Sequence, residues 1–424
     1  MLAAGRQAVA RASVPIGALG FANQGETVLA WQRESGRPLS AAVSWQDRRA
    51  STVCERLAGE AEWLRSLTGL PLDPYFAAPK MRWLREHVGG EGVCTTSDAW
   101  LLHRLCGAYV TDAATASRTL LLDLDAVAWS PRACVLFGVD PAAQPAIVAC
   151  AAPIGETRLL GGSVPVTGLA VDQQAALFGE ACLANGEAKC TYGTGAFLLA
   201  TIGRTAHRST SGLATCIAWQ LGGETTYCLD GQVYTVGAAV SWLQDLRLLD
   251  DPSDLDRLGG SVPDAGGVVF VPALAGLAAP FWRPSARGAF AGLSLATSRA
   301  QLVRAVVEGI AAQVAWLARA VAADLHRPLA RLRVDGGLTR SHVLMQTQAD
   351  LLQAPVEAYP SPHATALGVA ALARLGSGAA RDANEALGPM RPAAIYEPRT
   401  SADQAEATLQ RWRRAAEATM ELPA

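Results

Sequence analysis

The stretch "GLAVDQQAALFGEA", residues 168–181, sets a carboxylate and two amides ahead of a run of small and apolar residues. The run has the character of a buried helix and ends at "ANGEA", residues 184–188, so we expect a domain boundary near 175–187. Asp172 has two ordinary interpretations, a helix N-cap or a surface charge. A third interpretation is catalytic, because a carboxylate beside amide side chains that can hold a polyol is suited to accept a hydroxyl proton.

The length and composition of the chain predict a soluble two-domain protein. Its 424 residues exceed one ordinary core, half of them are hydrophobic, and the formal net charge is -2. That balance excludes an electrostatic attraction to nucleic acid or to an anionic membrane. Basic residues are almost all arginine, since only Lys80 and Lys189 are lysines. The 9 cysteines are scattered without metal-ligand spacing, which indicates reduced thiols in a cytoplasmic protein.

Two segments raise the question of membrane insertion or export. The uncharged stretch "AGGVVFVPALAGLAAPFW", residues 265–282, is long enough to span a bilayer, but Pro272 and Pro280 favour a buried strand followed by a loop. The amino terminus carries Arg6 and Arg11 without a clear apolar core or cleavage site. We therefore predict no membrane span and no signal peptide, and an amphipathic helix at the start.

Short β-branched runs alternate with longer helical periods, which indicates an α/β architecture. Strands are expected at 16–22 and 27–31. Residues 188–201 are expected to form two strands around a glycine turn, residues 225–234 a strand and a turn, and residues 329–337 a strand that runs into a glycine turn. Helices are expected at 98–107, 298–325, 341–352 and 364–376, with Ser298 starting the longest.

Glycine turns at strand ends are candidate phosphate-binding sites. They are "TYGTG" (191–195), "DGG" (335–337) and, more loosely, "GGVVFVPALAG" (266–276). Such turns let backbone N–H groups approach a phosphate, although a plain hairpin turn explains each one alone. Neither the Walker signature nor the dinucleotide fingerprint is present, so those two nucleotide folds lose support.

Long motifs in a fixed order give a resemblance that covers essentially the whole chain. The chain resembles the FGGY family of carbohydrate kinases in "DQQAALFG" (172–179), "TYGTGAF" (191–197), "VDGGLTRSHVLMQ" (334–346) and "ATALGVAAL" (364–372). It is similar to the branch that phosphorylates glycerol in "VSWQDRR" (43–49), "TGLPLDPYFAAPKMRWL" (68–84), "TDAATASRTLL" (111–121) and "LAAPFWRPSARGAFAGL" (277–293).

The resemblance implies two ribonuclease-H-like domains, as in actin and hexokinase, with a cleft between them. Residues 1–180 would form the domain on the substrate side and residues 181–424 the domain on the nucleotide side. The implied activity is ATP-dependent phosphorylation of glycerol to glycerol 3-phosphate, with Mg²⁺ accompanying ATP. A homo-oligomer is compatible with the resemblance.

The resemblance also carries roles onto single residues. Asp172 matches the catalytic base and would help to hold Mg²⁺. Contacts to the polyol fall on Glu26, Trp45, Tyr75, Gln173 and Phe197, besides Asp172. Contacts to the nucleotide fall on Gly193, Thr194, Gly237, Gly336 and Gly337. A small triol has one hydroxylated edge and one C–H edge, so its pocket needs a polar wall and an apolar wall.

Several positions depart from the family pattern. Gly25, in "NQGE", replaces the arginine of an Asn-Gln-Arg-Glu motif, which removes a charge-assisted donor pair that contributes about 1.5–3 kcal/mol to binding. Ser241 and Ser341 replace Gln and Asn near the nucleotide, and the loop that binds fructose 1,6-bisphosphate in some members is shortened to 159–168.

The last departure concerns the front of the chain, which starts downstream of the family's first β-hairpin and first phosphate turn. A start codon assigned too late explains this better than a true remnant, because the remaining cleft residues are mostly intact. We expect the 424 residues alone to aggregate and to lack activity, and an upstream extension of about 55–60 residues to restore both. The rivals to a glycerol kinase activity are a kinase for another small polyol or sugar, and an inactive binding protein.

Overall fold

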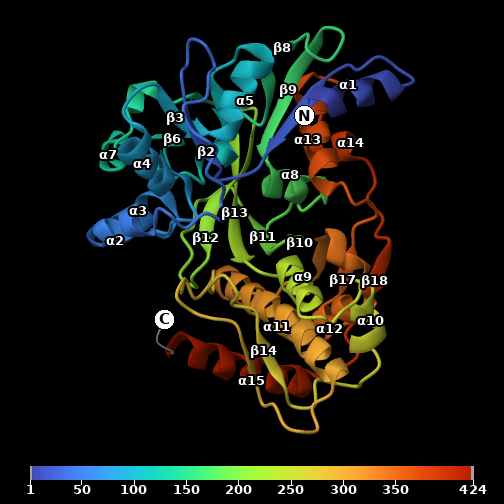
Figure 1. Ribbon diagram of the computed structural model, residues 1–424. Helices are drawn as coiled ribbons and strands as arrows, with labels where there is room; N and C mark the ends of the chain where they lie inside the picture. Colours follow the sequence, from blue (N-terminus) through green and yellow to red (C-terminus); the bar gives the residue numbers. More distant parts are fainter. Residues whose placement is uncertain (1, 422–424) are drawn as a thin grey trace.

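The computed structural model describes residues 2–421 and arranges them in two stacked parts, with the amino-terminal part uppermost in Figure 1. The elements of the upper part are α1 (Leu2–Arg11), β1 (Leu19–Asn23), β2 (Val28–Trp31), α2 (Ser51–Arg56), η1 (Ala58–Glu60), α3 (Ala61–Thr68), α4 (Ala77–Val88), β3 (Val93–Thr96), α5 (Ser97–Cys106), β4 (Val110–Asp112), α6 (Ala113–Ala116), β5 (Leu122–Asp123), β6 (Ala128–Trp129), α7 (Pro131–Leu136), η2 (Pro141–Ala143), β7 (Ala146–Val148), β8 (Ala151–Thr157), β9 (Val164–Val171) and α8 (Asp172–Gly179).

The lower part follows in sequence. The remaining elements, all in the lower part except α13 and α14, which lie beside the upper sheet, are β10 (Ala188–Tyr192), β11 (Ala196–Gly203), β12 (Ala214–Leu221), β13 (Glu224–Val233), α9 (Gly237–Asp245), α10 (Asp254–Gly259), β14 (Val269–Val271), β15 (Ala289–Ala291), α11 (Arg299–Leu325), β16 (Leu332–Asp335), η3 (Gly337–Arg340), α12 (His342–Leu352), β17 (Val356–Ala358), α13 (Ala364–Gly376), α14 (Ala383–Leu387), β18 (Ala394–Tyr396) and α15 (Ala402–Glu421). The alternation of strands and helices confirms the predicted two-domain α/β class.

Sheets in the two parts differ in size. The upper sheet has the strand order β1-β9-β8, with β1 parallel to β9 at one edge. The predicted strand at 16–22 is shifted to Leu19–Asn23, and β2 pairs with β3 in a separate ladder. The lower sheet has the order β12-β13-β11-β10-β16-β17-β18, in which β10, β16 and β17 run parallel.

One predicted turn is wrong. Residues 225–234 were expected to form a strand and a turn, but β13 runs unbroken from Glu224 to Val233 through Asp230 and Gly231. A Cβ on Gly231 would lie 2.8 Å from Leu317 Cδ2, so this glycine lets α11 pack closely against the strand. The glycine marks close packing inside a sheet rather than a change of direction.

Helix α13 lies late in the sequence but packs on the upper sheet (Figure 1). Its Gly368 faces α8, where a Cβ would lie 1.8 Å from the carbonyl oxygen of Ala175, and a Cβ on Gly179 of α8 would lie 2.4 Å from the carbonyl oxygen of Ala364. The Thr167 hydroxyl of β9 donates to the carbonyl of Ala373 at 2.8 Å. The backbones of α13 and α8 are therefore in direct contact, and α8 is the helix that begins with Asp172.

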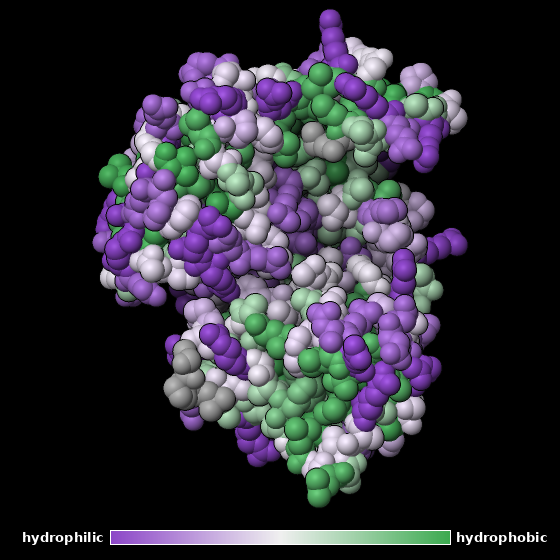
Figure 2. Space-filling model, viewed as in Figure 1, coloured by the Kyte–Doolittle hydropathy of each residue, from purple (hydrophilic) through white to green (hydrophobic). Residues whose placement is uncertain are grey.

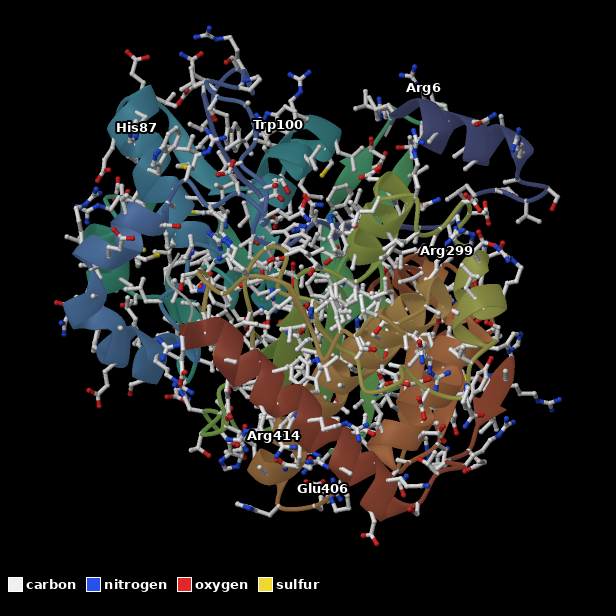
Figure 3. The ribbon with its side chains drawn as sticks, turned by 60° about the horizontal axis from the view of Figure 1, so that its bottom comes forward. Arg6, His87, Trp100, Arg299, Glu406 and Arg414 are labelled. Atoms are coloured by element: carbon white, nitrogen blue, oxygen red, sulfur yellow. The ribbon has the colours of Figure 1, made fainter. Side chains whose placement is uncertain are left out.

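Helix α11 is the central helix of the lower part. Ser298 caps it in a reciprocal bond pair with Gln301, as its predicted start requires. By length and composition α11 is the one helix among residues 2–421 that could cross a membrane, and 78% of its apolar window is buried inside the protein. Figure 3 shows α15 beside it, with Glu406 and Arg414 at the end of the molecule opposite Arg6 on α1.

The other predicted elements appear close to their expected bounds. They are the helices α1, α5, α12 and α13, and the strands β2, β10, β11, β14 and β16. All nine cysteines are free thiols, and seven of them are buried.

Candidate active site

A cavity of about 150 Å³ lies where the turn after β1, the start of α8 and the turn after β10 meet. Figure 2 shows hydrophilic residues in the hollow between the two parts of the molecule. All six residues predicted to contact a polyol line this cavity, although their positions in the sequence range from 26 to 197. The full lining is Gln24, Gly25, Glu26, Trp45, Tyr75, Arg118, Asp172, Gln173, Thr191, Gly193, Thr194 and Phe197.

Asp172 is the first residue of α8, and Val171 is the N-cap, so the N-cap interpretation of Asp172 is wrong. Its Oδ1 accepts the backbone N–H of Gln173 at 2.8 Å. Burial raises the pKa of Asp172 above its ordinary value, and the charge of Lys189 opposes that shift. The carboxylate thus combines a fixed position with a raised proton affinity, which suits a proton acceptor.

Glu26 belongs to a buried ion cluster that joins the two parts. The Arg118 guanidinium, with 2% of its side chain exposed, donates from Nε to Glu26 Oε1 and from Nη1 to Asp230 Oδ2. Its Nη2 also donates to the Tyr75 hydroxyl at 3.1 Å. Glu26 and Arg118 come from the upper part, whereas Asp230 lies on β13 of the lower sheet.

The charge balance of this cluster affects Glu26. Burial raises the pKa of Glu26 to about 7, and the neighbouring Arg118 limits the rise. One cation faces two buried carboxylates, and Asp230 Oδ1 has no hydrogen-bond partner among the described residues. A ligand that brings hydroxyl donors to Glu26 would compensate the excess of acceptors.

Aromatic rings close the opposite wall. Trp45 stands edge-on to Tyr75 and to Phe197, with ring centroids 6.0 Å and 5.5 Å apart. Such contacts fix the ring orientations and present C–H and π surface to the cavity. The cavity therefore has one polar and one apolar wall.

Gly25 leaves the polar wall without a side chain at that position. A Cβ there would lie 2.8 Å from Val171 Cγ2 and 3.7 Å from Arg118 Nε. A larger residue at position 25 would displace the Val171 side chain and would lie next to the Arg118 guanidinium.

The predicted nucleotide glycines converge beside the cavity. The N–H of Gly237, at the start of α9, donates to the carbonyl of Gly193 at 3.0 Å, and a Cβ on Gly237 would lie 2.5 Å from that oxygen. Gly336 has a φ of 99°, and a Cβ on it would lie 2.4 Å from the carbonyl oxygen of Tyr192. Thr194 is exposed, and Gly337 faces open space. These turns adjoin because β10 and β16 are parallel neighbours.

Sequence reasoning missed four charged residues around the site: Lys80, Arg118, Lys189 and Asp230. Arg118, in "ATASRTLLL", and Asp230, in "TTYCLDGQV", are each a single charge inside an apolar or hydroxyl-rich run. A charge in such a run is costly to bury unless it is paired, and that rule was the available signal.

Comparison with known proteins agrees with this architecture. The model of the FGGY carbohydrate kinase N-terminal domain matches residues 3–179, and that of the C-terminal domain matches residues 188–376. The chain belongs to the FGGY family of carbohydrate kinases.

Its relatives include a glycerol kinase of Myxococcus xanthus, 45% identical over 95% of this chain and 85% of that protein. A glycerol kinase of Thermus brockianus is 43% identical over 98% of this chain and 87% of that protein. Among solved structures, Plasmodium falciparum glycerol kinase with ADP superposes with a TM-score of 0.89 at 32% identity, covering 100% of this chain and 88% of that one.

Proposed function

We propose that the protein transfers the terminal phosphoryl group of ATP to a hydroxyl of glycerol, which yields glycerol 3-phosphate. The observation that carries the proposal is the cavity in which Asp172 and Glu26 face the rings of Trp45 and Phe197. The 41–45% identity to relatives named glycerol kinases supports it.

Each wall has a function in this proposal. Glu26 accepts hydrogen bonds from substrate hydroxyls, while Trp45 and Phe197 pack against the carbon side of the substrate. Gln173, next to the base, supplies an amide contact, and Tyr75 limits the depth of the cavity. A cavity of about 150 Å³ suits a small polyol and not a nucleotide, so ATP must lie outside it, along the glycine turns.

Asp172 takes the proton of the attacking hydroxyl. Since Oδ1 accepts the Gln173 N–H, the second carboxylate oxygen remains to receive the proton. Burial makes Asp172 a stronger base than a solvated aspartate, and the charge of Lys189 opposes this rise in its pKa. Asp172 and the turn of Gly193 and Thr194 line the same cavity, so a hydroxyl held at Asp172 would lie near a phosphate held at that turn.

The residues present fit ATP with Mg²⁺. Gly193 and Thr194 form a turn at the cavity with open space beside Gly193, which leaves a phosphate room to approach the backbone. Gly237 and Gly336 pack against the carbonyls of Gly193 and Tyr192 and hold that turn in place. Mg²⁺ takes one or two carboxylates together with phosphate oxygens and water, and Asp172 offers one carboxylate at the cavity. When bound, the ion neutralises charge on the transferring group.

The test uses the product of the whole reading frame, including any codons in frame upstream of Met1. Replacing Asp172→Asn keeps the shape but removes the proton acceptor, so glycerol-dependent ATP turnover should fall by about 10²–10⁴-fold. Binding of ATP, measured by calorimetry, should stay unchanged. Asp125→Asn, on an exposed side chain outside the cavity, is the matched control. An Asp172→Asn protein with near-parental turnover would contradict the assignment.

A kinase for another small polyol or sugar is the second candidate, and Gly25 favours it. Gly25 brings no side chain to the cavity wall where the family pattern has an arginine, so a larger substrate would contact the backbone there. A substrate that makes this contact should lose turnover in Gly25→Arg, whereas glycerol should not.

A further inference from the structure

The two lysines of this chain occupy unusual positions. Among 36 lysines and arginines only Lys80 and Lys189 are lysines, and both are fully buried. Buried ammonium groups are costly unless they are paired and hydrogen-bonded. Both contact residues that line the cavity described above.

Lys80 holds the backbone of one cavity wall. It lies on α4 and donates from Nζ to the carbonyls of Pro74, Tyr75 and Phe76 at 2.9, 2.5 and 2.8 Å. Three acceptors use all three N–H donors of an ammonium group. The middle residue, Tyr75, lines the cavity and accepts from Arg118, so Lys80 fixes where that ring stands.

Lys189 holds the opposite wall. It lies on β10 and donates from Nζ to Gln173 Oε1 at 2.6 Å and to Thr191 Oγ1 at 2.7 Å. Both acceptors line the cavity, one beside Asp172 and one at the entry to the glycine turn. One buried cation thus connects the substrate side of α8 with the phosphate turn of the lower sheet.

We propose that Lys80 and Lys189 are positioning residues for phosphoryl transfer, an inference that rests on the proposed function. Lys80 sets the Tyr75 wall against which the polyol packs. Lys189 fixes Gln173 and Thr191 relative to each other, and therefore the substrate relative to the phosphate.

An arginine cannot take the place of Lys80. Three carbonyls of consecutive residues converge on one nitrogen, whereas a guanidinium spreads its donors over a planar fork. Lys80→Arg keeps a basic side chain with N–H donors but not their geometry, and should therefore remain as impaired as Lys80→Met.

The kinetic test separates the two lysines. Lys80→Met should mainly raise the KM for glycerol, since it loosens a binding wall. Lys189→Met should mainly lower kcat, on the order of 100-fold, because it misaligns substrate and phosphate. Measurements are made well below the thermal unfolding temperature of each variant.

Arg208→Met is the matched control. Arg208 also holds three backbone carbonyls, those of Ser66, Leu67 and Ala206, but none lines the cavity. Its loss should lower the unfolding temperature and leave kcat and KM within about twofold. Lysine variants whose kinetic constants move no more than those of Arg208→Met would overturn the proposal.

A second measurement works on the unmutated protein. Lysine labelled with ¹³C at Cε gives one signal for each of the two lysines. Saturating glycerol should shift both signals. Unchanged signals in a protein that phosphorylates glycerol would overturn this inference alone. A protein that neither binds nor phosphorylates glycerol would overturn the proposed function and this inference with it.

Discussion

The two sides of the candidate active site differ in whether side chains or backbone form them. On the proposed polyol side, side chains form the site: Arg118 joins Glu26 and Asp230, and Trp45 closes the opposite wall. On the proposed nucleotide side, backbone turns form it, and a Cβ on Gly237 or Gly336 would meet a carbonyl oxygen. Substitutions on the first side should change substrate affinity and stability through charge. Substitutions on the second side should act through backbone geometry.

The largest effect is expected from Arg118→Met. It leaves Glu26 and Asp230 buried without their cation, and breaking such a buried pair costs about 3–5 kcal/mol. Chemical denaturation should show this as a lower free energy of unfolding.

The control for that loss is Arg204→Met, which breaks an exposed ion pair with Glu224 and should cost about 0–1 kcal/mol. Equal losses in the two variants would mean that the buried cluster does not stabilise the junction of the two parts.

The next effect belongs to the nucleotide side. Gly336→Ala forces an alanine into a φ of 99° against the Tyr192 carbonyl, a strain of about 1–3 kcal/mol. The KM for ATP should rise while that for glycerol changes little. Gly337→Ala, where a Cβ meets open space, should behave like the parent. A rise in the glycerol KM alone would show that the two sides are not separate.

Much of the fold followed from local pattern. The bounds of a helix with a long apolar period and an N-cap, such as α11 after Ser298, can be predicted from a few neighbouring residues. The course of β13 through Asp230 and Gly231 did not follow from local pattern, because Gly231 is needed for close packing against Leu317 on a helix distant in sequence. Likewise the packing of α13 on the upper sheet depends on contacts far apart in sequence.

Prediction of the site had the same limit. Asp172, Glu26 and the aromatic residues were predicted from motifs, and the structure places them around one cavity. Arg118 was missed because its partner Asp230 lies 112 residues away. No local pattern reveals a pairing over that distance, although an arginine in an apolar run implies that a partner exists.

A smaller effect is expected at Gly25. Gly25→Arg restores a donor pair beside Glu26 but must displace Val171, which a Cβ approaches to 2.8 Å. The KM for glycerol should fall about tenfold, the lower end of what such a pair contributes. Gly25→Ala, which brings the crowding without the donors, is the control. Loss of glycerol activity in Gly25→Arg would indicate a larger natural substrate.

The smallest effect is a pH dependence. The pKa of Glu26 is raised to about 7, so the carboxylate acceptor is present above that pH and is lost as the pH falls through it. The KM for glycerol should rise about threefold between pH 7.5 and 6.5. In Glu26→Gln the KM should be higher and flat over this range. The same slope in both proteins would assign the titration to another group.

The most direct test of the account is the choice of substrate by the unmutated protein. Side chains enclose a cavity of about 150 Å³ on the proposed polyol side. We therefore predict that kcat/KM is highest for glycerol in a panel with four- and five-carbon polyols. Mass spectrometry should identify glycerol 3-phosphate as the product formed with ATP. A higher kcat/KM for a longer polyol, with glycerol turned over poorly, would contradict the account.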